Sequence, residues 1–167
     1  VDEFVLREIM PLESDPGAWN EFDNIRLDVR DRVRVAAKAA GLWAPQMPKE
    51  LGGLGLPMTG QAVFYETANR SIFGPSCFNC AAPDDGNMMV LDRVLPDAMK
   101  EEWLLPIVRG DVQSAFAMTE PDGCGSDPNL TYTRAERAGN DRWRITGRKW
   151  FITGAGNAKI FIIIART

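Results

Sequence analysis

The chain has 167 residues, enough for one well-packed core or for one core and part of a second. Its 45% hydrophobic and 25% charged residues are typical of a globular protein, and its net charge of −4 argues against nucleic acid or an anionic membrane as a partner. The absence of histidine excludes Ser-His-Asp and Cys-His catalysis within the chain and removes the commonest zinc ligand. The longest apolar run, residues 160–165, is too short to span a bilayer. We therefore expect no metal site and no membrane-spanning segment.

The three cysteines bear on redox function and on location. Cys77 and Cys80 have the C-x-x-C spacing of redox dithiols, but no strand-to-helix pattern precedes them. Ordinary half-buried thiols are the favoured interpretation, and with Cys124 they form no four-ligand metal set. The cysteine content and the absence of a signal-peptide pattern in residues 1–11 predict a reducing cytoplasm.

The first two-thirds of the chain predict helices. One long amphipathic helix is indicated by apolar residues three and four positions apart, and Gly41 can end it. The residues of this stripe are Phe22, Ile25, Val29, Val33, Ala36 and Ala40. Basic residues on the same segment alternate with aspartates and predict a solvated, ion-paired face, which consists of Arg26, Arg30, Arg32 and Arg34.

Further helices follow a loop rich in proline and glycine at residues 45–57. They are predicted over residues 61–71, 87–94 and 97–109. In the first of these, the candidates for burial are Val63, Phe64 and Ala68. Pro96 separates the last two, and Asp97 is the expected N-cap of the final one. Residues 75–86 are expected to be irregular, with Asp84 and Asp85 as a solvated pair.

The hydrophobic period changes after Gly110 and Asp111, where short runs rich in β-branched and aromatic residues predict strands. These runs cover residues 113–118, 131–138, 143–146, 149–153 and 160–166. The second and third flank Gly139-Asn140-Asp141, which predicts a hairpin.

These elements define an α+β chain. An all-α helical domain over residues 1–112 is followed by an incomplete β-barrel-like domain over residues 113–167. So few strands leave edges unpaired and cannot close a barrel. We therefore expect further polypeptide to complete the sheet, in the same reading frame or in a partner.

Two motifs in the β part indicate flavin chemistry. The first, residues 116–121, reads Phe-Ala-Met-Thr-Glu-Pro and is followed by Gly125-Ser126-Asp127; the second, residues 149–154, reads Lys-Trp-Phe-Ile-Thr-Gly. An oxidised isoalloxazine ring carries several acceptors and one donor, so a protein binds it with backbone groups, a hydroxyl and a flat apolar surface. Short strands supply aligned backbone groups, while Thr119 and Thr153 offer rigid hydroxyls.

Together the two motifs resemble the flavin-binding strands of the acyl-CoA dehydrogenases, and the resemblance extends from Trp19 to Thr167. It implies that backbone groups and one hydroxyl from Phe116, Met118 and Thr119 contact the flavin ring of FAD. It also places Phe151 against the ring and Thr153 near its N5 atom.

The resemblance also implies a phosphate-binding turn. Gly125 would let the backbone approach the phosphates, and Ser126 matches a serine near the flavin pyrophosphate and the bound acyl-CoA. Residues 122–125 are one residue longer here than the usual Gly-Ala-Gly. In addition, residues 78–89 resemble an acyl-pocket loop and helix in one branch of the family. Glu120 and Asp127 are interpreted as turn or cap residues.

The reaction that the resemblance implies is α,β-dehydrogenation of an acyl-CoA thioester, with FAD as the hydride acceptor. The family's catalytic base is a glutamate in a C-terminal helical domain. No carboxylate of this chain matches it, so we assign no catalytic residue and expect the chain alone to be inactive. The implied partners are an acyl-CoA substrate, electron-transferring flavoprotein as electron acceptor, and further copies of the full-length chain.

Two alternatives remain open at this point. One is a short, non-catalytic subunit that pairs with a chain supplying the missing domain. The other is an acyl-CoA oxidase or a nitroalkane oxidase-like flavoenzyme of the same superfamily.

Overall fold

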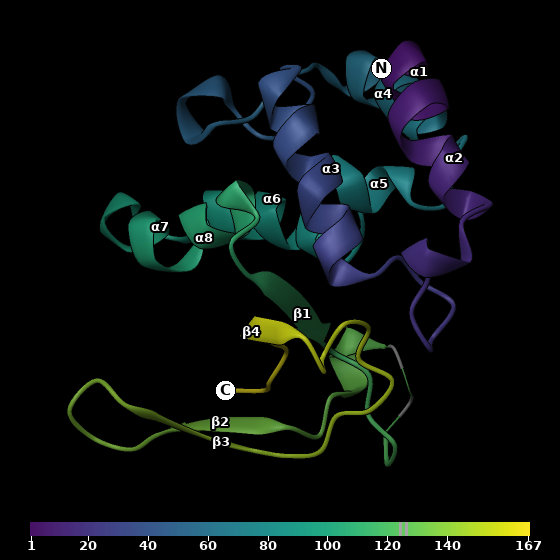
Figure 1. Cartoon of the computed structure of the whole chain (residues 1–167). Coiled ribbons are helices and arrows are strands. Elements are labelled where there is room, and N and C mark those ends of the chain that lie inside the picture. Colours follow the sequence, from purple (N-terminus) through teal and green to yellow (C-terminus); the bar gives the residue numbers. More distant parts are fainter. Residues whose placement is uncertain (124, 126) are drawn as a thin grey trace. The chain divides into compact units, whose positions relative to one another are not determined.

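The computed structural model describes residues 1–123, 125 and 127–167 (Figure 1). These residues divide into two compact units, Val1–Asp111 and Val112–Thr167. The first is helical and the second contains short strands, which confirms the α+β class and the order of its two parts. The described strands close no barrel. The division lies one residue from the predicted boundary between residues 112 and 113.

The helical unit contains eleven helical elements within the described residues. In chain order they are α1 (Asp2–Phe4), the π-helical turn η1 (Val5–Ile9), α2 (Met10–Glu13), the 3-10 turn η2 (Pro16–Ala18), α3 (Leu27–Ala39), the 3-10 turn η3 (Lys49–Leu51), α4 (Met58–Ala68), α5 (Gly74–Cys77), α6 (Asp84–Val94), α7 (Asp97–Trp103) and α8 (Leu105–Arg109).

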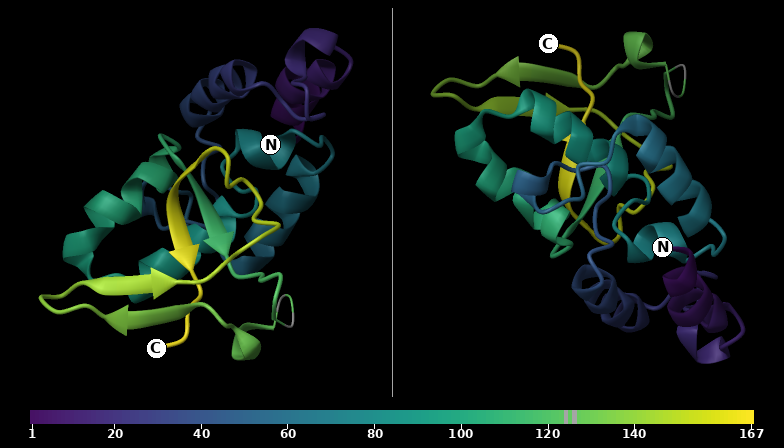
Figure 2. Two further views of the ribbon diagram at one scale, coloured as in Figure 1. Left: turned by 90° about the horizontal axis from the view of Figure 1, so that it is seen from below. Right: turned by 90° about the horizontal axis from the view of Figure 1, so that it is seen from above.

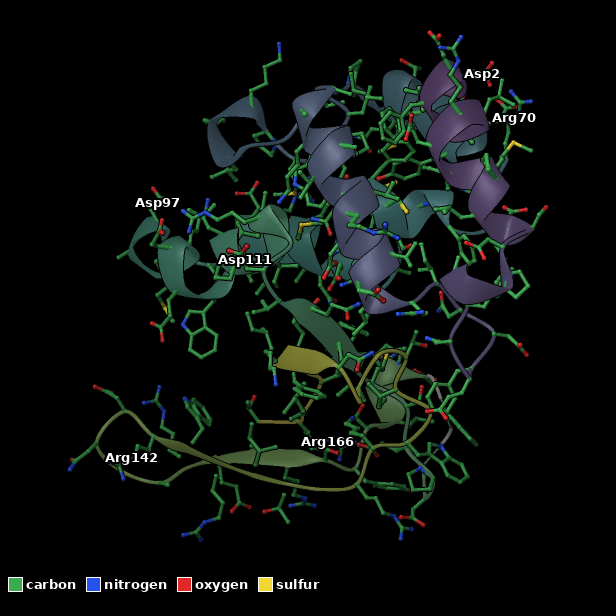
Figure 3. The ribbon with its side chains drawn as sticks, in the orientation of Figure 1. Asp2, Arg70, Asp97, Asp111, Arg142 and Arg166 are labelled. Atoms are coloured by element: carbon green, nitrogen blue, oxygen red, sulfur yellow. The ribbon has the colours of Figure 1, made fainter. Side chains whose placement is uncertain are left out.

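The N-terminal helical segment, α1 to α2, has no counterpart among the elements predicted from the sequence. Val5 and Ile9, four residues apart, are fully buried and fix this segment to the core. Arg70 also pairs with Asp2, and Figure 3 shows the two side chains together. Since the pair is exposed, the buried apolar residues supply most of the attachment.

Helix α3 is shorter than the predicted amphipathic helix. It begins at Leu27, and Phe22, the first residue of the predicted stripe, is 78% exposed. The Asn20 side chain accepts hydrogen bonds from the backbone of Phe22 and Asn24, which holds this stretch in a turn. The predicted end is confirmed, because Gly41 follows the helix with a φ of 68°.

The predicted solvated, ion-paired basic face is confirmed for Arg26, whose exposed side chain pairs with Asp28, and is wrong for Arg30 and Arg34. Arg30 and Arg34 are both buried. The Arg34 guanidinium donates to the backbone oxygen of Ser76 at 2.9 Å and lies over the Trp43 ring. Burial lowers the pKa of Arg34 to about 10. The Arg34 side chain therefore links α3 to α5, and its aliphatic part is buried within the helical unit.

Two other helices differ from their predicted bounds. Helix α4 starts three residues early at Met58; Phe64 and Ala68 are buried as predicted, but Val63 is exposed. Helix α6 begins at Asp84, inside the stretch expected to be irregular. Asp84 is buried and Asp85 accepts a hydrogen bond from the Tyr65 hydroxyl at 2.9 Å, so the predicted solvated pair is wrong.

The predicted helix over residues 97–109 is interrupted. Pro106 occupies the first turn of α8, where its missing N–H costs nothing, and α7 therefore ends at Trp103. The Asp97 carboxylate makes no capping bond to the helix backbone, contrary to prediction. It pairs instead with Lys100, three residues along.

Gly74 packs so closely against neighbouring backbone that a larger residue would not fit, which yields a first prediction. A Cβ at Gly74 would overlap the backbone oxygen of Ala68, the last residue of α4, which cannot move aside as the end of a flexible side chain could. We expect Gly74→Ala to lower the free energy of unfolding by about 3 kcal/mol, the upper range for overpacking. Gly86→Ala is the matched control, because nothing lies within 4 Å of its added Cβ; it should raise stability by about 1 kcal/mol. Urea unfolding measures both, and equal effects would contradict the packing argument.

The cysteine pair yields a second prediction. Cys77 and Cys80 are free and buried, more deeply than the half-buried thiols that we expected. Burial raises the pKa of Cys77 to about 11 and that of Cys80 to about 12. At about pH 8 both thiols are therefore protonated and unreactive. We expect iodoacetamide to modify neither in the folded chain and both in urea, as read by peptide mass mapping. Rapid alkylation of the folded chain would show that these thiols are accessible.

The β unit contains four described strands and one 3-10 turn. They are β1 (Gln113–Ala117), η4 (Pro128–Leu130), β2 (Arg134–Arg137), β3 (Trp143–Thr146) and β4 (Ala158–Ile163). β1 pairs with β4 in parallel, and Figure 2 shows the two side by side. β2 and β3 form the predicted antiparallel hairpin. Its turn places Gly139, Asn140 and Asp141 at positive φ, as these residue types favour.

The predicted strand over residues 149–153 does not form. Phe151 has a φ of 51°, a left-handed conformation that ends an extended run, and a series of turns follows it before β4. The strand prediction for this segment was wrong because it rested on apolar and aromatic composition alone. No helix of the described residues is long and apolar enough to cross a membrane.

Candidate functional site

The two sequence motifs lie side by side in the β unit. The Lys149 ammonium donates to the backbone oxygen of Met118 at 2.7 Å, and the Trp150 N–H donates to that of Thr119 at 3.1 Å. Two consecutive residues of the second motif thus bind two consecutive carbonyls of the first. The structure brings together Met118 and Thr119 on one side and the start of residues 149–154 on the other.

The backbone groups of Phe116 and Met118 point toward the open edge of β1. The Ala117 oxygen accepts a hydrogen bond from the N–H of Ile164, so the backbone groups of Ala117 face β4. Alternate residues of a strand direct their backbone groups to opposite edges. Phe116 and Met118 therefore direct theirs away from β4, where β1 has no second neighbouring strand among the described residues.

Thr119, two residues past the end of β1, carries unused hydrogen-bonding groups. Across the described part of the chain, no hydrogen bond uses the Thr119 N–H or the Thr119 hydroxyl. The residue is half-buried. The pair of donors is therefore open to water or to a ligand.

Trp150 and Phe151 form an exposed aromatic pair. Their ring centroids lie 4.5 Å apart, and the side chains are 44% and 80% exposed. An apolar surface of this kind commonly marks a binding site. The Phe151 ring lies outside the protein core, where a planar ligand could pack on it.

Thr153 lies in the exposed turn after this pair, and within the described residues no hydrogen bond joins it to Thr119. Gly125 has a φ of 68° and its oxygen accepts the Glu120 N–H at 3.2 Å. A glycine is favoured at this backbone conformation, which exposes the peptide to an approaching group. Ser126 lies outside the described residues.

Glu120 is the residue that sequence reasoning misread. Instead of a turn residue, it is a buried acceptor that binds the backbone N–H groups of Tyr132 at 2.6 Å and Thr133 at 2.8 Å, the Thr133 hydroxyl, and the Lys149 ammonium at 2.9 Å. Burial alone would raise the pKa of Glu120, but the bonds from Thr133, Lys149 and Tyr132 lower it to about 2. An ionised, fully engaged carboxylate cannot serve as a general base. Asp127, by contrast, does cap a helical turn, by accepting from the Asn129 N–H.

The only signal for this role was the position of Glu120 between Thr119 and Pro121. A carboxylate in a turn is usually solvated, so nothing in the local sequence distinguishes one whose partners lie twelve to twenty-nine residues further along the chain. Within the described residues, no group of three or more potential ligands could hold a metal ion.

The chain belongs to the acyl-CoA dehydrogenase family. The N-terminal domain of that family matches residues 1–111, and its middle domain matches residues 115–167. Human acyl-CoA dehydrogenase family member 11 is 34% identical over the whole chain, which spans 22% of that protein. The chain thus spans about a fifth of the length of the first curated relatives that it matches.

Solved structures agree with this assignment. A homologue from Mycobacterium abscessus described as an acyl-CoA dehydrogenase superposes with a TM-score of 0.82 and 38% identity, over 97% of this chain and 43% of that one. An acyl-CoA dehydrogenase from Bacillus anthracis, solved in complex with FAD, gives a TM-score of 0.64 and 25% identity, over 99% of this chain and 27% of that one.

Proposed function

We propose that this chain is the N-terminal helical domain and the flavin-facing start of the middle domain of an FAD-dependent acyl-CoA dehydrogenase. The observation that carries the proposal is the open edge of β1, where unused backbone donors lie against the motif that bears an exposed aromatic pair. Its chemistry matches the needs of an isoalloxazine ring: donors in a row, a free hydroxyl and a flat apolar surface.

The proposed binding residues divide into two groups. The open edge contributes backbone groups of Phe116 and Met118, and Thr119, just beyond β1, contributes its N–H and hydroxyl. The neighbouring segment contributes the Phe151 ring and the Thr153 hydroxyl. Gly125 and Ser126 are proposed to lie near the pyrophosphate, where Gly125, which has no side chain, allows close approach of the backbone.

FAD, when bound, would accept the hydride from the β carbon of an acyl-CoA thioester. The residues of this chain would bind and orient the ring and shield one part of it from water. Glu120, the buried carboxylate beside the edge, is not free to remove the α proton, since it is ionised and engaged by four donors. We propose that polypeptide outside these 167 residues supplies the base, in keeping with the share of the relatives that the chain spans.

The wider proposal follows from family membership. It includes an acyl-CoA substrate, electron-transferring flavoprotein as the acceptor and a homo-oligomer of the full-length chain. A cytoplasmic location is proposed separately, from the cysteine content and the sequence of residues 1–11.

Native mass spectrometry of the complete translation product, followed by anaerobic mixing with acyl-CoA, tests the proposal. We expect a protein longer than 167 residues that carries FAD and loses its visible flavin absorbance when acyl-CoA is added, while the purified 1–167 chain shows no such loss. A complex of this chain with a second polypeptide would indicate a split enzyme. Rapid reoxidation of the reduced flavin by dioxygen would indicate an oxidase, and absence of flavin from every species would refute the proposal.

A further inference from the structure

We propose that Lys149 is a positioning residue for the flavin-facing edge, an inference that rests on the proposed function. Its ammonium fixes the Met118–Thr119 peptide and the aromatic segment relative to each other. None of its contacts requires Lys149 to touch a ligand.

The burial of Lys149 distinguishes it from its neighbours. Its side chain is 11% exposed and that of Glu120 is 5% exposed, whereas the adjacent pair of Arg148 and Asp122 is 69% and 67% exposed. A lysine stays buried and charged only when acceptors replace its water, and two do so here: the Met118 oxygen at 2.7 Å and a Glu120 oxygen at 2.9 Å.

The bond to Met118 acts on the proposed ring contact of Thr119. The Met118 oxygen and the Thr119 N–H belong to the same peptide unit, so a cation on the oxygen polarises that N–H and strengthens it as a donor. The Thr119 N–H has no partner among the described residues, which leaves it available to a ring acceptor. Lys149 thus prepares a donor that it does not itself contact.

The same side chain determines where the aromatic pair begins. The Trp150 N–H binds the Thr119 oxygen, one peptide further along than the carbonyl that Lys149 binds. Two successive residues bound to two successive carbonyls fix both the register and the direction of the second motif along the first. Phe151 follows at once, with a left-handed backbone conformation.

Lys149→Met tests the inference, because methionine keeps most of the side-chain length and removes the donor and the charge. Arg148→Met is the matched control, since it removes an adjacent cation whose partner is exposed. Two readouts apply: hydrogen exchange of the Trp150 amide without flavin, and the Kd for FAD by flavin fluorescence. We expect Lys149→Met to raise the exchange rate of the Trp150 amide about tenfold and to raise the Kd for FAD about tenfold. We expect Arg148→Met to change each of these quantities by no more than about twofold.

A third readout separates positioning from stability. At saturating FAD, Lys149→Met should shift the absorption maximum of the bound flavin, because the Thr119 donor to the ring is weakened; a loss of stability alone would leave that maximum unchanged. If Lys149→Met does not fold, the double variant Glu120→Gln/Lys149→Met, which leaves no unpaired buried charge, takes its place with the same expectations.

The outcomes separate this inference from the proposed function. If the unaltered chain and the full-length protein both fail to bind FAD, the proposed function fails, and the Trp150 exchange rate still decides whether Lys149 positions the segment. Unchanged exchange in Lys149→Met overturns the inference in every case. Faster exchange with unchanged FAD affinity and spectrum also overturns it, because the residue would then be merely structural.

Discussion

Glu120→Gln should destabilise the β unit more than any other single substitution of a charged residue within it. The carboxylate accepts from the N–H groups of Tyr132 and Thr133, from the Thr133 hydroxyl, and from Lys149. Glutamine offers one acceptor oxygen where there were two, and places an NH₂ group against donors. It also leaves the buried Lys149 ammonium without its counter-charge, which is more costly than removing a whole ion pair.

Urea unfolding of the β unit, followed by the NMR signals of its amides, measures this effect. Glu136→Gln is the matched control, because Glu136 is exposed on β2 and surface substitutions change stability by about 0.5 kcal/mol or less. The unfolding midpoint should fall clearly for Glu120→Gln and stay in place for the control. Equal midpoints would mean that the carboxylate network contributes nothing net.

The same carboxylate gives the β unit a defined acid sensitivity. The pKa of Glu120 is about 2 in the folded chain, below its ordinary value of 4.5. The unfolded state therefore binds a proton first as the pH falls, so the stabilisation is complete above pH 4.5 and is lost progressively toward pH 2. Glu120→Gln should remove this part of the pH dependence, and its persistence in the variant would assign the acid transition to other carboxylates.

Phe78→Ala should cost the helical unit about 4 kcal/mol, the range for emptying a buried phenylalanine site. Phe78 is fully buried, and its ring packs on those of Phe4 at 5.5 Å and Phe64 at 5.2 Å. These partners come from α1 and α4, so the cavity would lie where three distant parts of the chain meet. The close backbone packing at Gly74, whose oxygen accepts the Phe78 N–H, limits how far the site can collapse.

Phe22→Ala is the control for this prediction, because it removes the same side chain from a site that is 78% exposed. Its effect should lie within about 0.5 kcal/mol. Thermal or urea unfolding of the helical unit compares the two. A large loss of stability in Phe22→Ala would support burial of Phe22 in the apolar stripe predicted from the sequence. A small loss of stability in Phe78→Ala would contradict burial of Phe78 in the core.

The helical half shows what periodicity predicts and what it does not. Spacing of three and four located α3 and its end at Gly41, because both follow from local chemistry. Spacing also assigned Phe22 to the helix, because an apolar residue at helical spacing gives no sign that Asn20 holds it in a turn. It also treated Arg34 as solvated, since burial of an arginine depends on the distant carbonyl of Ser76.

The residues of the candidate site were proposed from the chemistry of the two motifs and from the family resemblance. The geometry of the site could not be predicted in this way. Threonine, phenylalanine and glycine at the right places indicated a flavin edge, but strand propensity assigned residues 149–153 to a strand. The structure instead places a left-handed Phe151 there, because the side chain of Lys149 and the backbone of Trp150 are held by the first motif. Such long-range bonds cannot be read from local composition.

Titration of the isotope-labelled chain with FAD, followed through its backbone amide signals, decides whether the proposed edge binds flavin. We expect the amides of Phe116, Met118, Thr119, Phe151 and Thr153 to shift together with one binding isotherm, and we expect Phe151→Ala to weaken FAD binding while Phe22→Ala does not. Shifts confined to the helical unit, or none at FAD concentrations that saturate the full-length protein, would contradict flavin binding at this edge.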